Sequence, residues 1–309
     1  ERVLTAWAVL RAAREAGAPA AELAALAAKR GAALEELRGE FHSKLEAVAR
    51  GEITRFLTVV NEEVIRAKAM FLSYSDPFEK YRALLFEYAH TLGHGVEAFM
   101  NDLYRRAESL GIDTQDAFRL HGQCVGMAVL WAGEMSMTMG HLEGDGYLAH
   151  QALIYLFNRF GGFDFAPLRA LCDELGVSRS EFCEGVLRVV RRDNKRGYCH
   201  CAPDSSVDQL VQRRPGCLLR SSDPSAELRY LVEVSEDSQR EVLERAFDGA
   251  YDRVLELESG ELALVPRAAV QDKSPGEGAG RKASALRRLL RRMYEEEEEE
   301  AEAWAAPRG

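Results

Sequence analysis

The sequence has little of several features that mark particular classes of protein. It has no apolar run near the roughly 20 residues of a transmembrane helix, and its net charge of −10 is opposite to that of a general nucleic-acid binder. We therefore expect no membrane and no nucleic-acid partner. Six cysteines in 309 residues, with no CxxC pair, predict neither a disulfide framework nor a structural zinc site. No signal segment follows Glu1, so we expect a cytoplasmic fragment of a longer protein.

What the sequence does contain is a globular composition rich in helix-forming segments. Its residues are 47% hydrophobic and 29% charged, enough to bury a core. Within the first 50 residues we expect Gly17-Ala18-Pro19 and Gly31 to separate about three short helices. Apolar residues at helical spacing predict further helices over residues 52–72, 77–110, 121–139, 145–159, 166–174, 179–191 and 236–250.

Strand signals are few and come late in the chain. Short apolar runs at 217–219 and 228–234 are expected to pair as strands. Residues 251–265 are expected to form a hairpin whose turn is Ser259-Gly260. The pattern is typical of a mainly α-helical fold with a few short strands.

Composition predicts three parts, which are a helical segment at 1–51, one helical domain at 52–265, and a flexible linker with a charged tail at 266–309. In the tail, six basic residues between Arg281 and Arg292 precede an acidic run from Glu295 to Glu300. We expect a solvated, partly helical tail. A tail that binds a partner is the alternative.

Ionisable residues gather in one of the predicted helices. His90 and His94 are four residues apart and share a helix face, and Glu87 and Glu97 lie within about 80° of them. Turning four such groups toward a core is unfavourable unless something neutralises them, and a divalent metal ion with a polar ligand would do so. The alternative is that each histidine is an ordinary core or surface group.

A third histidine, His121, is expected to begin the next apolar helix. The positive end of that helix would keep the imidazole neutral and able to bind metal. Gly122 and Gly126 would allow another backbone to approach closely. Two histidines and a carboxylate would suit a catalytic zinc ion.

At these residues the sequence resembles the sugar-phosphate cyclases, the family of 3-dehydroquinate synthase and 2-deoxy-scyllo-inosose synthase. The family's Gly-His-Thr-x-Gly-His-x-x-Glu segment is similar to residues 89–97, and its His-Gly-Glu segment is similar to residues 121–123. Residues 193–198, Asp-Asn-Lys-Arg-Gly-Tyr, look like its phosphate-binding turn. The resemblance covers about residues 52–250.

The resemblance implies a fold and a set of site residues. The fold is the dehydroquinate synthase-like C-terminal helical metal-binding domain, with the family's N-terminal nucleotide-binding domain missing. His90 and His121 would bind Zn²⁺ or Co²⁺, and His94 and Glu87 would be catalytic. Glu87 favours the inosose branch over the dehydroquinate branch, so the substrate would be glucose 6-phosphate or a similar sugar phosphate.

The implied reaction is that of a metal- and NAD-dependent lyase acting on carbon–oxygen or phosphorus–oxygen bonds. Phosphate is eliminated and the ring closes by an intramolecular aldol step. Lys68, Lys195 and Arg196 would bind the substrate, and a cation at a turn suits a phosphate. NAD would be bound mainly by a domain absent from this chain, and the isolated fragment need not be active. Partners would be a second copy or that N-terminal domain.

Several departures from the family keep other interpretations open. Ala89 replaces the usual Gly, which is a small change, and Gln123 replaces the usual Glu. No Gly-rich nucleotide turn is present, and the third metal ligand is not assigned. One alternative is a relative of the iron-dependent alcohol dehydrogenases, in which Lys195→Ala would not abolish turnover. Another is a non-catalytic interaction protein derived from the cyclase domain.

Overall fold

A computed structural model describes residues 9–10, 12–13, 16–50, 61–62, 64–65, 68–69, 86–193, 206–210, 212–214, 217–218, 231–270 and 281–293. The chain divides into two compact units, Glu1–Ser73 and Tyr74–Gly309. The three histidines of the predicted site all lie in the second unit. The predicted domain boundaries at 51 and 265 stay predictions.

The first unit contains one long helix, α2, over Ala20–Arg50. The predicted break at 17–19 is present, because Gly17 has a left-handed backbone with φ of 70° and the helix begins just after it. The predicted break at Gly31 is wrong. A helical Gly costs only about 1 kcal/mol relative to Ala, and the surrounding Ala, Leu and Glu residues are strong helix formers. No atom lies within 4 Å of the position that a Cβ on Gly31 would take.

The second unit is built mainly from helices. Those predicted after residue 120 are confirmed with ends shifted by a few residues, and none of the described helices is long and apolar enough to cross a bilayer. The helices are α4 (His90–Leu110), α5 (His121–Thr138), α6 (Gly144–Gly161), α7 (Ala166–Glu174), α8 (Arg179–Val190) and α9 (Glu236–Phe247).

The helix predicted from residue 77 differs at its start. Residues 77–85 lie outside the described part, 86–87 form a 3₁₀ turn, and α4 begins only at His90. Ala89 caps it with φ of 65° and ψ of −6°. A left-handed residue turns the chain away from the right-handed helical path, so the turn at residues 86–88 does not continue α4.

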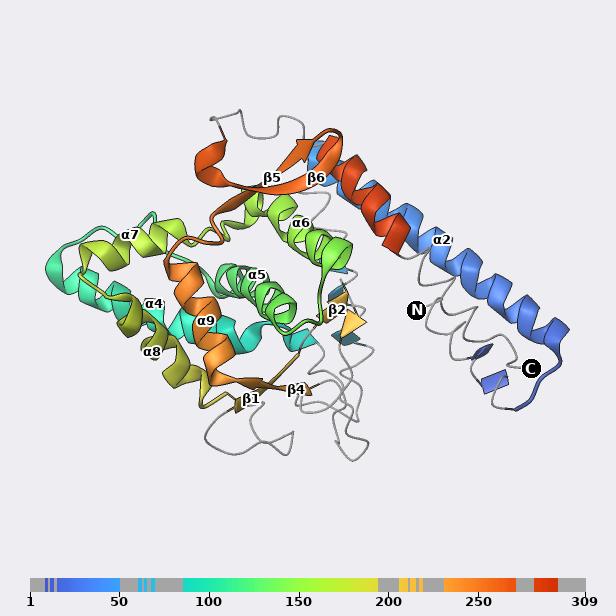
Figure 1. Ribbon diagram of the computed structural model, residues 1–309, viewed down its shortest axis with the longest axis horizontal. Coiled ribbons are helices and arrows are strands. Elements are labelled where there is room, and N and C mark those ends of the chain that lie inside the picture. Colours follow the sequence, from blue (N-terminus) through green and yellow to red (C-terminus); the bar gives the residue numbers. More distant parts are fainter. Residues whose placement is uncertain are drawn as a thin grey trace. The chain divides into compact units, whose positions relative to one another are not determined.

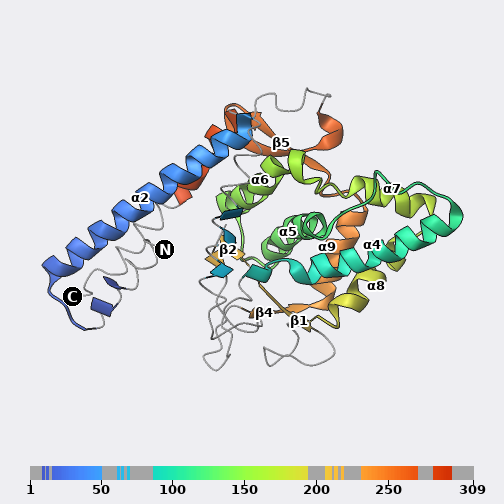
Figure 2. The same ribbon diagram turned by 180° about the vertical axis from the view of Figure 1, so that it is seen from behind.

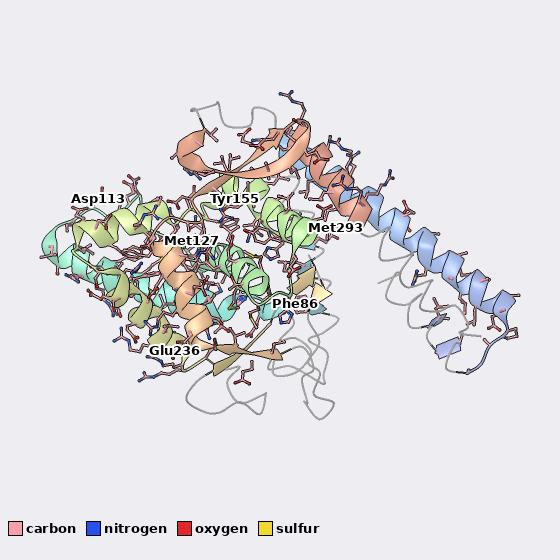
Figure 3. All side chains as sticks on the ribbon, in the orientation of Figure 1. Phe86, Asp113, Met127, Tyr155, Glu236 and Met293 are labelled. Atoms are coloured by element: carbon pink, nitrogen blue, oxygen red, sulfur yellow. The ribbon has the colours of Figure 1, made fainter. Side chains whose placement is uncertain are left out.

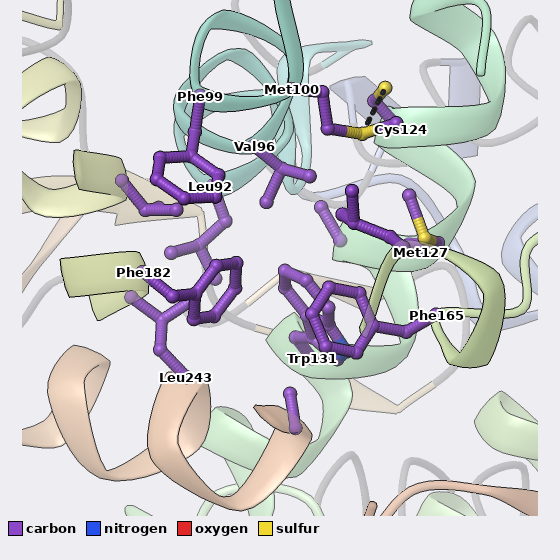
Figure 4. Close-up of a cluster of buried hydrophobic side chains, with 14 of the residues drawn as sticks. Leu92, Val96, Phe99, Met100, Cys124, Met127, Trp131, Phe165, Phe182 and Leu243 are labelled. Carbon is purple, nitrogen blue, oxygen red and sulfur yellow. Dashed lines mark hydrogen bonds between the residues drawn. The ribbon is translucent and has the colours of Figure 1, made fainter. Parts of the chain in front are cut away.

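The apolar α5 lies at the centre of the second unit, with α4, α6 and α9 around it (Figure 1). Trp131, Met127 and Cys124 of α5 are at most 2% exposed and meet apolar side chains of the neighbouring helices (Figure 4). The ring of Phe182 on α8 packs edge to face on Trp131, with centroids 6.5 Å apart. Met127 accordingly lies inside the bundle, whereas Glu236 lies near its edge (Figure 3). This core holds α4, α5 and α8 together.

The described strands form three separate antiparallel pairs. These are β1 (Ser206–Leu210) with β4 (Leu231–Ser235), β2 (Gln212–Arg214) with β3 (Cys217–Leu218), and β5 (Arg253–Glu258) with β6 (Glu261–Pro266). The predicted pairing of 217–219 with 228–234 is wrong, because each run pairs with a strand that precedes it.

The hairpin predicted at 251–265 is confirmed as β5 and β6. Ser259 and Gly260 both have positive φ, of 52° and 86°. Two left-handed residues in sequence are typical of the tight turn whose twist matches that of a hairpin.

The charged tail is not simply solvated. Residues 281–293 are helical, and Leu286 is fully buried. Lys282 pairs with Glu256 of the hairpin at 3.1 Å, and Arg292 pairs with Asp145 of α6 at 3.2 Å. The apolar residues between the basic ones form a buried face, and the prediction from charge alone did not take them into account. The expectation of a partly helical segment is confirmed, and that of a solvated one is wrong over these residues.

Candidate metal and substrate site

The structure brings the three predicted histidines together. His90 and His94 lie one turn apart at the start of α4, with ring centroids 5.5 Å apart. His121, the first residue of α5, lies 5.7 Å from the ring of His90 and 5.6 Å from that of His94. The starts of α4 and α5 lie side by side in both views (Figures 1 and 2). We call these three residues the histidine cluster.

Two glycines that flank His94 make this arrangement possible. A Cβ on Gly93 would lie 3.0 Å from Cγ2 and 3.1 Å from Cα of Val125 on α5. A Cβ on Gly95 would lie 2.8 Å from Cγ1 and 3.1 Å from the carbonyl oxygen of Val186 on α8. Neither contact leaves room for a side chain. The Gly-His-Gly sequence therefore lets α5 and α8 both approach α4 next to His94.

Hydrogen bonds orient two rings of the cluster. Nδ1 of His90 donates to the backbone carbonyl oxygen of Tyr88 at 3.3 Å, and Nδ1 of His121 donates to Oε2 of Glu97 at 2.8 Å. A carbonyl and a carboxylate can only accept, so in each neutral ring the proton is on Nδ1 and the lone pair on Nε2. Metal-binding histidines are commonly oriented by the same two kinds of acceptor.

His94 has a different partner. Its Nδ1 lies 3.6 Å from Oδ2 of Asp193, just beyond the end of α8. The Asp193 side chain is only 4% exposed, whereas that of His94 is 39% exposed.

Tyr88, whose carbonyl accepts from His90, is anchored in the core by its side chain. The hydroxyl lies 3.1 Å from Nε2 of His150 on α6, and the two rings meet edge to face. Burial lowers the pKa of His150 to about 4, so this imidazole is neutral at physiological pH. Burial also raises the pKa of the Tyr88 phenol, which stays protonated. The turn before α4 is thus tied to α6 by a neutral hydrogen bond.

A buried carboxylate ties α5 to the hairpin. Glu134 is 2% exposed, and burial raises its pKa even though the hydroxyl of Tyr147 donates to it. Nη1 of Arg253 on β5 lies 3.3 Å from Oε1 of Glu134 and 2.7 Å from the Tyr147 hydroxyl. Nε2 of Gln151 also donates to Glu134, at 3.4 Å. The carboxylate is satisfied on one oxygen, and its Oε2 has no hydrogen-bond partner among the described residues.

The remaining predicted site residues are located only by the segment of the chain to which they belong. Glu87 lies half-buried in the 3₁₀ turn before α4. The prediction that four ionisable side chains, from Glu87 to Glu97, share one helix face is therefore wrong. Of these, only those from His90 onward share the helix. Lys68 belongs to the first compact unit. Lys195 and Arg196 lie outside the described residues.

Gln123, where the family usually has Glu, caps the start of α5. Its Oε1 accepts a hydrogen bond of 2.8 Å from the backbone N–H of Leu120, at the start of α5. A Glu could accept the same bond, so the substitution keeps the cap. The prediction that Gly122 and Gly126 let another backbone approach is wrong, because the neighbour of Gly126 is a side-chain ring. A Cβ on Gly126 would meet the Phe163 ring at 2.3 Å, whereas Gly122 faces open space.

The structure assembles the histidines but no complete metal site. Within the described ranges, no three His, Cys, Asp or Glu side chains are arranged to hold a metal ion. The roles of Asp193, Glu97 and the flanking glycines were missed from sequence. Gly93 and Gly95 carried a signal, since paired glycines around a helical histidine are unfavourable without a packing reason.

Comparison with known proteins identifies relatives of one kind. No family model matches the chain. Curated proteins named 2-deoxy-scyllo-inosose synthase do match. That of Micromonospora echinospora is 29% identical over 153 residues, covering 50% of this chain and 31% of the relative. That of Streptomyces paromomycinus is 30% identical over 160 residues, covering 52% and 33%. That of Niallia circulans is 28% identical over 141 residues, covering 46% and 30%.

The predicted relationship to the sugar-phosphate cyclases is confirmed by these relatives, and the chain spans about a third of their length. A crystal structure described as 2-deoxy-scyllo-inosose synthase complexed with carbaglucose-6-phosphate, NAD⁺ and Co²⁺ is 20% identical. It covers 55% of this chain and 37% of that one, with a TM-score of 0.33. A score this low is too weak for a comparison of the two folds.

Proposed function

We propose that this chain supplies metal- and substrate-binding residues of a sugar-phosphate cyclase similar to 2-deoxy-scyllo-inosose synthase. The observation that carries the proposal is the histidine cluster, whose ring centroids lie within 5.7 Å of one another. The reaction class is elimination of phosphate from a sugar phosphate followed by intramolecular aldol closure. We propose glucose 6-phosphate as the substrate, because Glu87 stands where the inosose branch has Glu.

The residues present fit two ligands of a divalent metal ion. His90 and His121 hold their protons on Nδ1 through Tyr88 and Glu97, which leaves the Nε2 lone pairs for Zn²⁺ or Co²⁺. The third ligand is not identified among the described residues. When bound, such an ion supplies Lewis-acid polarisation of a hydroxyl or carbonyl oxygen of the sugar.

His94 is the member of the cluster best placed to move a proton. The buried carboxylate of Asp193 lies on the Nδ1 side of the ring and orients it. Nε2 is then the atom that would take a proton from the substrate and return it. Glu87, in the turn directly before α4, is proposed as the second catalytic group.

The described residues do not fit a site for NAD. A dinucleotide binds at the carboxyl ends of parallel strands, at a Gly-rich turn that opens a helix. The strands described here form only antiparallel pairs. We derive no step through NAD in this chain, and we propose that residues outside it bind the cofactor in the longer enzyme.

Metal binding tests the proposal directly. The purified chain is loaded with Co²⁺ or Zn²⁺, desalted, and analysed by plasma mass spectrometry. We expect close to one ion per chain, with the ion lost in His90→Ala and in His121→Ala. His141→Ala is the matched control, because His141 lies outside the cluster, and it should keep the metal. Equal metal content in all four proteins, or no metal in any, would overturn the metal site.

Binding of glucose 6-phosphate separates the cyclase from the interaction protein. The metal-loaded chain is titrated with glucose 6-phosphate by calorimetry, which needs no NAD and no turnover. Binding that His94→Ala weakens supports the cyclase. A chain that binds metal but shows no heat of binding with glucose 6-phosphate would favour the non-catalytic alternative.

A further inference from the structure

A fourth histidine, His150 of α6, lies outside the histidine cluster but is joined to one of its members through Tyr88. The Tyr88 hydroxyl lies 3.1 Å from Nε2 of His150. The backbone carbonyl of the same tyrosine accepts a hydrogen bond of 3.3 Å from Nδ1 of His90. Two hydrogen bonds and one intervening residue therefore connect a buried imidazole of α6 to a proposed metal ligand.

The position of His150 favours an apolar side chain rather than an imidazole. The residue is 4% exposed, and its Nδ1 has no hydrogen-bond partner in the described part of the chain. A buried polar atom without a partner lowers the free energy of unfolding. The ring fills space left by a glycine, since a Cβ on Gly133 would lie 2.6 Å from both Cε1 and Nδ1 of His150. An apolar ring could fill that space without the loss, so packing alone does not account for this histidine.

What an apolar ring would lack is the Nε2 atom that meets the Tyr88 hydroxyl. The rings of Tyr88 and His150 also pack edge to face, with centroids 5.8 Å apart. Tyr88 is followed by Ala89, whose left-handed backbone, with φ of 65°, leads into α4. A non-glycine residue keeps such a conformation only where its surroundings hold it. Anchoring the Tyr88 side chain therefore helps to hold the turn whose carbonyl faces His90.

We propose that His150 is a positioning residue for His90 and acts through Tyr88. By holding the phenol it fixes the Tyr88 carbonyl, and that carbonyl keeps the proton of His90 on Nδ1 and the lone pair on Nε2. Nε2 is the atom that would bind a divalent ion. His90 is taken as a metal ligand here, so this role of His150 rests on the proposed function.

Cobalt affinity tests this role. Metal-free protein is titrated with Co²⁺ by calorimetry, and the dissociation constant is compared between variants. Loss of a group that orients a metal-binding histidine typically weakens metal binding about 10–100-fold. His150 acts at one residue's remove, and Ser136 is another hydrogen-bonding neighbour of the Tyr88 hydroxyl. We therefore expect the lower end of that range, about tenfold, for His150→Phe. His150→Gln offers an amide oxygen as the acceptor and should recover most of the affinity.

Two further variants separate positioning from stability. Tyr88→Phe removes the other partner of the same hydrogen bond and should weaken Co²⁺ binding to a similar extent. The double variant, with phenylalanine at both positions, should bind no more weakly than either single variant, because the bond can be lost only once. Ala107→Gly is the matched control, since it destabilises α4 at a fully buried position away from the turn. It should bind Co²⁺ as the unmodified chain does.

A measurement without metal distinguishes this role from the proposed function. Nitrogen-15 NMR of the metal-free chain reports which nitrogen of His90 carries the proton. We expect Nδ1 in the unmodified chain and a mixture of both tautomers in His150→Phe. Failure of the unmodified chain to bind Co²⁺ would overturn the metal site, and the tautomers would still decide the role of His150. An unchanged tautomer in His150→Phe, an unchanged Co²⁺ affinity in that variant, or an equal loss of affinity in Ala107→Gly would overturn it.

Discussion

The backbone of Ala89, at the start of α4, gives the sharpest test of this structure. Ala89 has φ of 65°, although it is not glycine, and its side chain is only 4% exposed. A left-handed conformation brings Cβ of an L-residue too close to the following carbonyl oxygen, at about 1–2 kcal/mol. Replacement by Gly removes that strain. The same replacement in the interior of α4, at the fully buried Ala107, removes no strain.

The expected magnitudes follow from three contributions. Loss of a buried methyl group costs about 0.8 kcal/mol at either site. At Ala107 the lower helix propensity of Gly adds about 1 kcal/mol, so Ala107→Gly should lower the free energy of unfolding by about 2 kcal/mol. At Ala89 the greater freedom of Gly in the unfolded chain lowers the free energy of unfolding by about a further 0.5–1 kcal/mol. Relief of the left-handed strain raises it by about 1–2 kcal/mol. Ala89→Gly should therefore be close to neutral.

Thermal unfolding followed by circular dichroism measures the difference. For a unit of this size, each 1 kcal/mol shifts Tm by about 2–4 °C. Ala107→Gly should lower Tm by about 4–8 °C, and Ala89→Gly should leave it within about 2 °C. If both variants lose the same amount, Ala89 is not left-handed and this description of the start of α4 is wrong.

Three further predictions concern packing and buried charge. Gly95→Ala should lower the free energy of unfolding by about 1–3 kcal/mol in a urea titration, because its methyl group would meet Val186; an unchanged midpoint would contradict the close approach of α8. The pKa of His150 in the folded chain, about 4, lies below the ordinary 6.5. The neutral imidazole therefore contributes fully to the free energy of unfolding above pH 6.5, and that contribution is lost as the pH falls towards 4. His150→Gln should unfold with a Tm that depends less on pH in this window. Arg253→Gln should cost about 3 kcal/mol at pH 7 by leaving Glu134 without its ion-pair partner. Because burial raises the pKa of Glu134 above 4.5, that deficit should shrink as pH falls towards 4.5 and the carboxyl takes up its proton; a pH-independent deficit would refute the pairing.

Much of the architecture could be predicted from sequence because it is local. The spacing of apolar residues is enough to place α5 to α9, and Ser259-Gly260 marks the turn of the hairpin. Helix propensity gave a wrong break where the neighbouring helix formers outweighed a single residue, as at Gly31 within α2. It also failed for the strands at 217–218 and 231–235, because strand pairing depends on partners that local sequence does not specify.

The sequence by itself determined that His90 and His94 share one face of a helix, since the period of the α-helix fixes that relation. It also determined that His121 begins the next helix. Only the tertiary structure brought His121 to Glu97 and Asp193 to His94, because those contacts depend on how closely three helices pack. That packing depends on two glycines without side chains. The left-handed backbone of Ala89 was likewise decided by the fold, since alanine by itself prefers a right-handed helix.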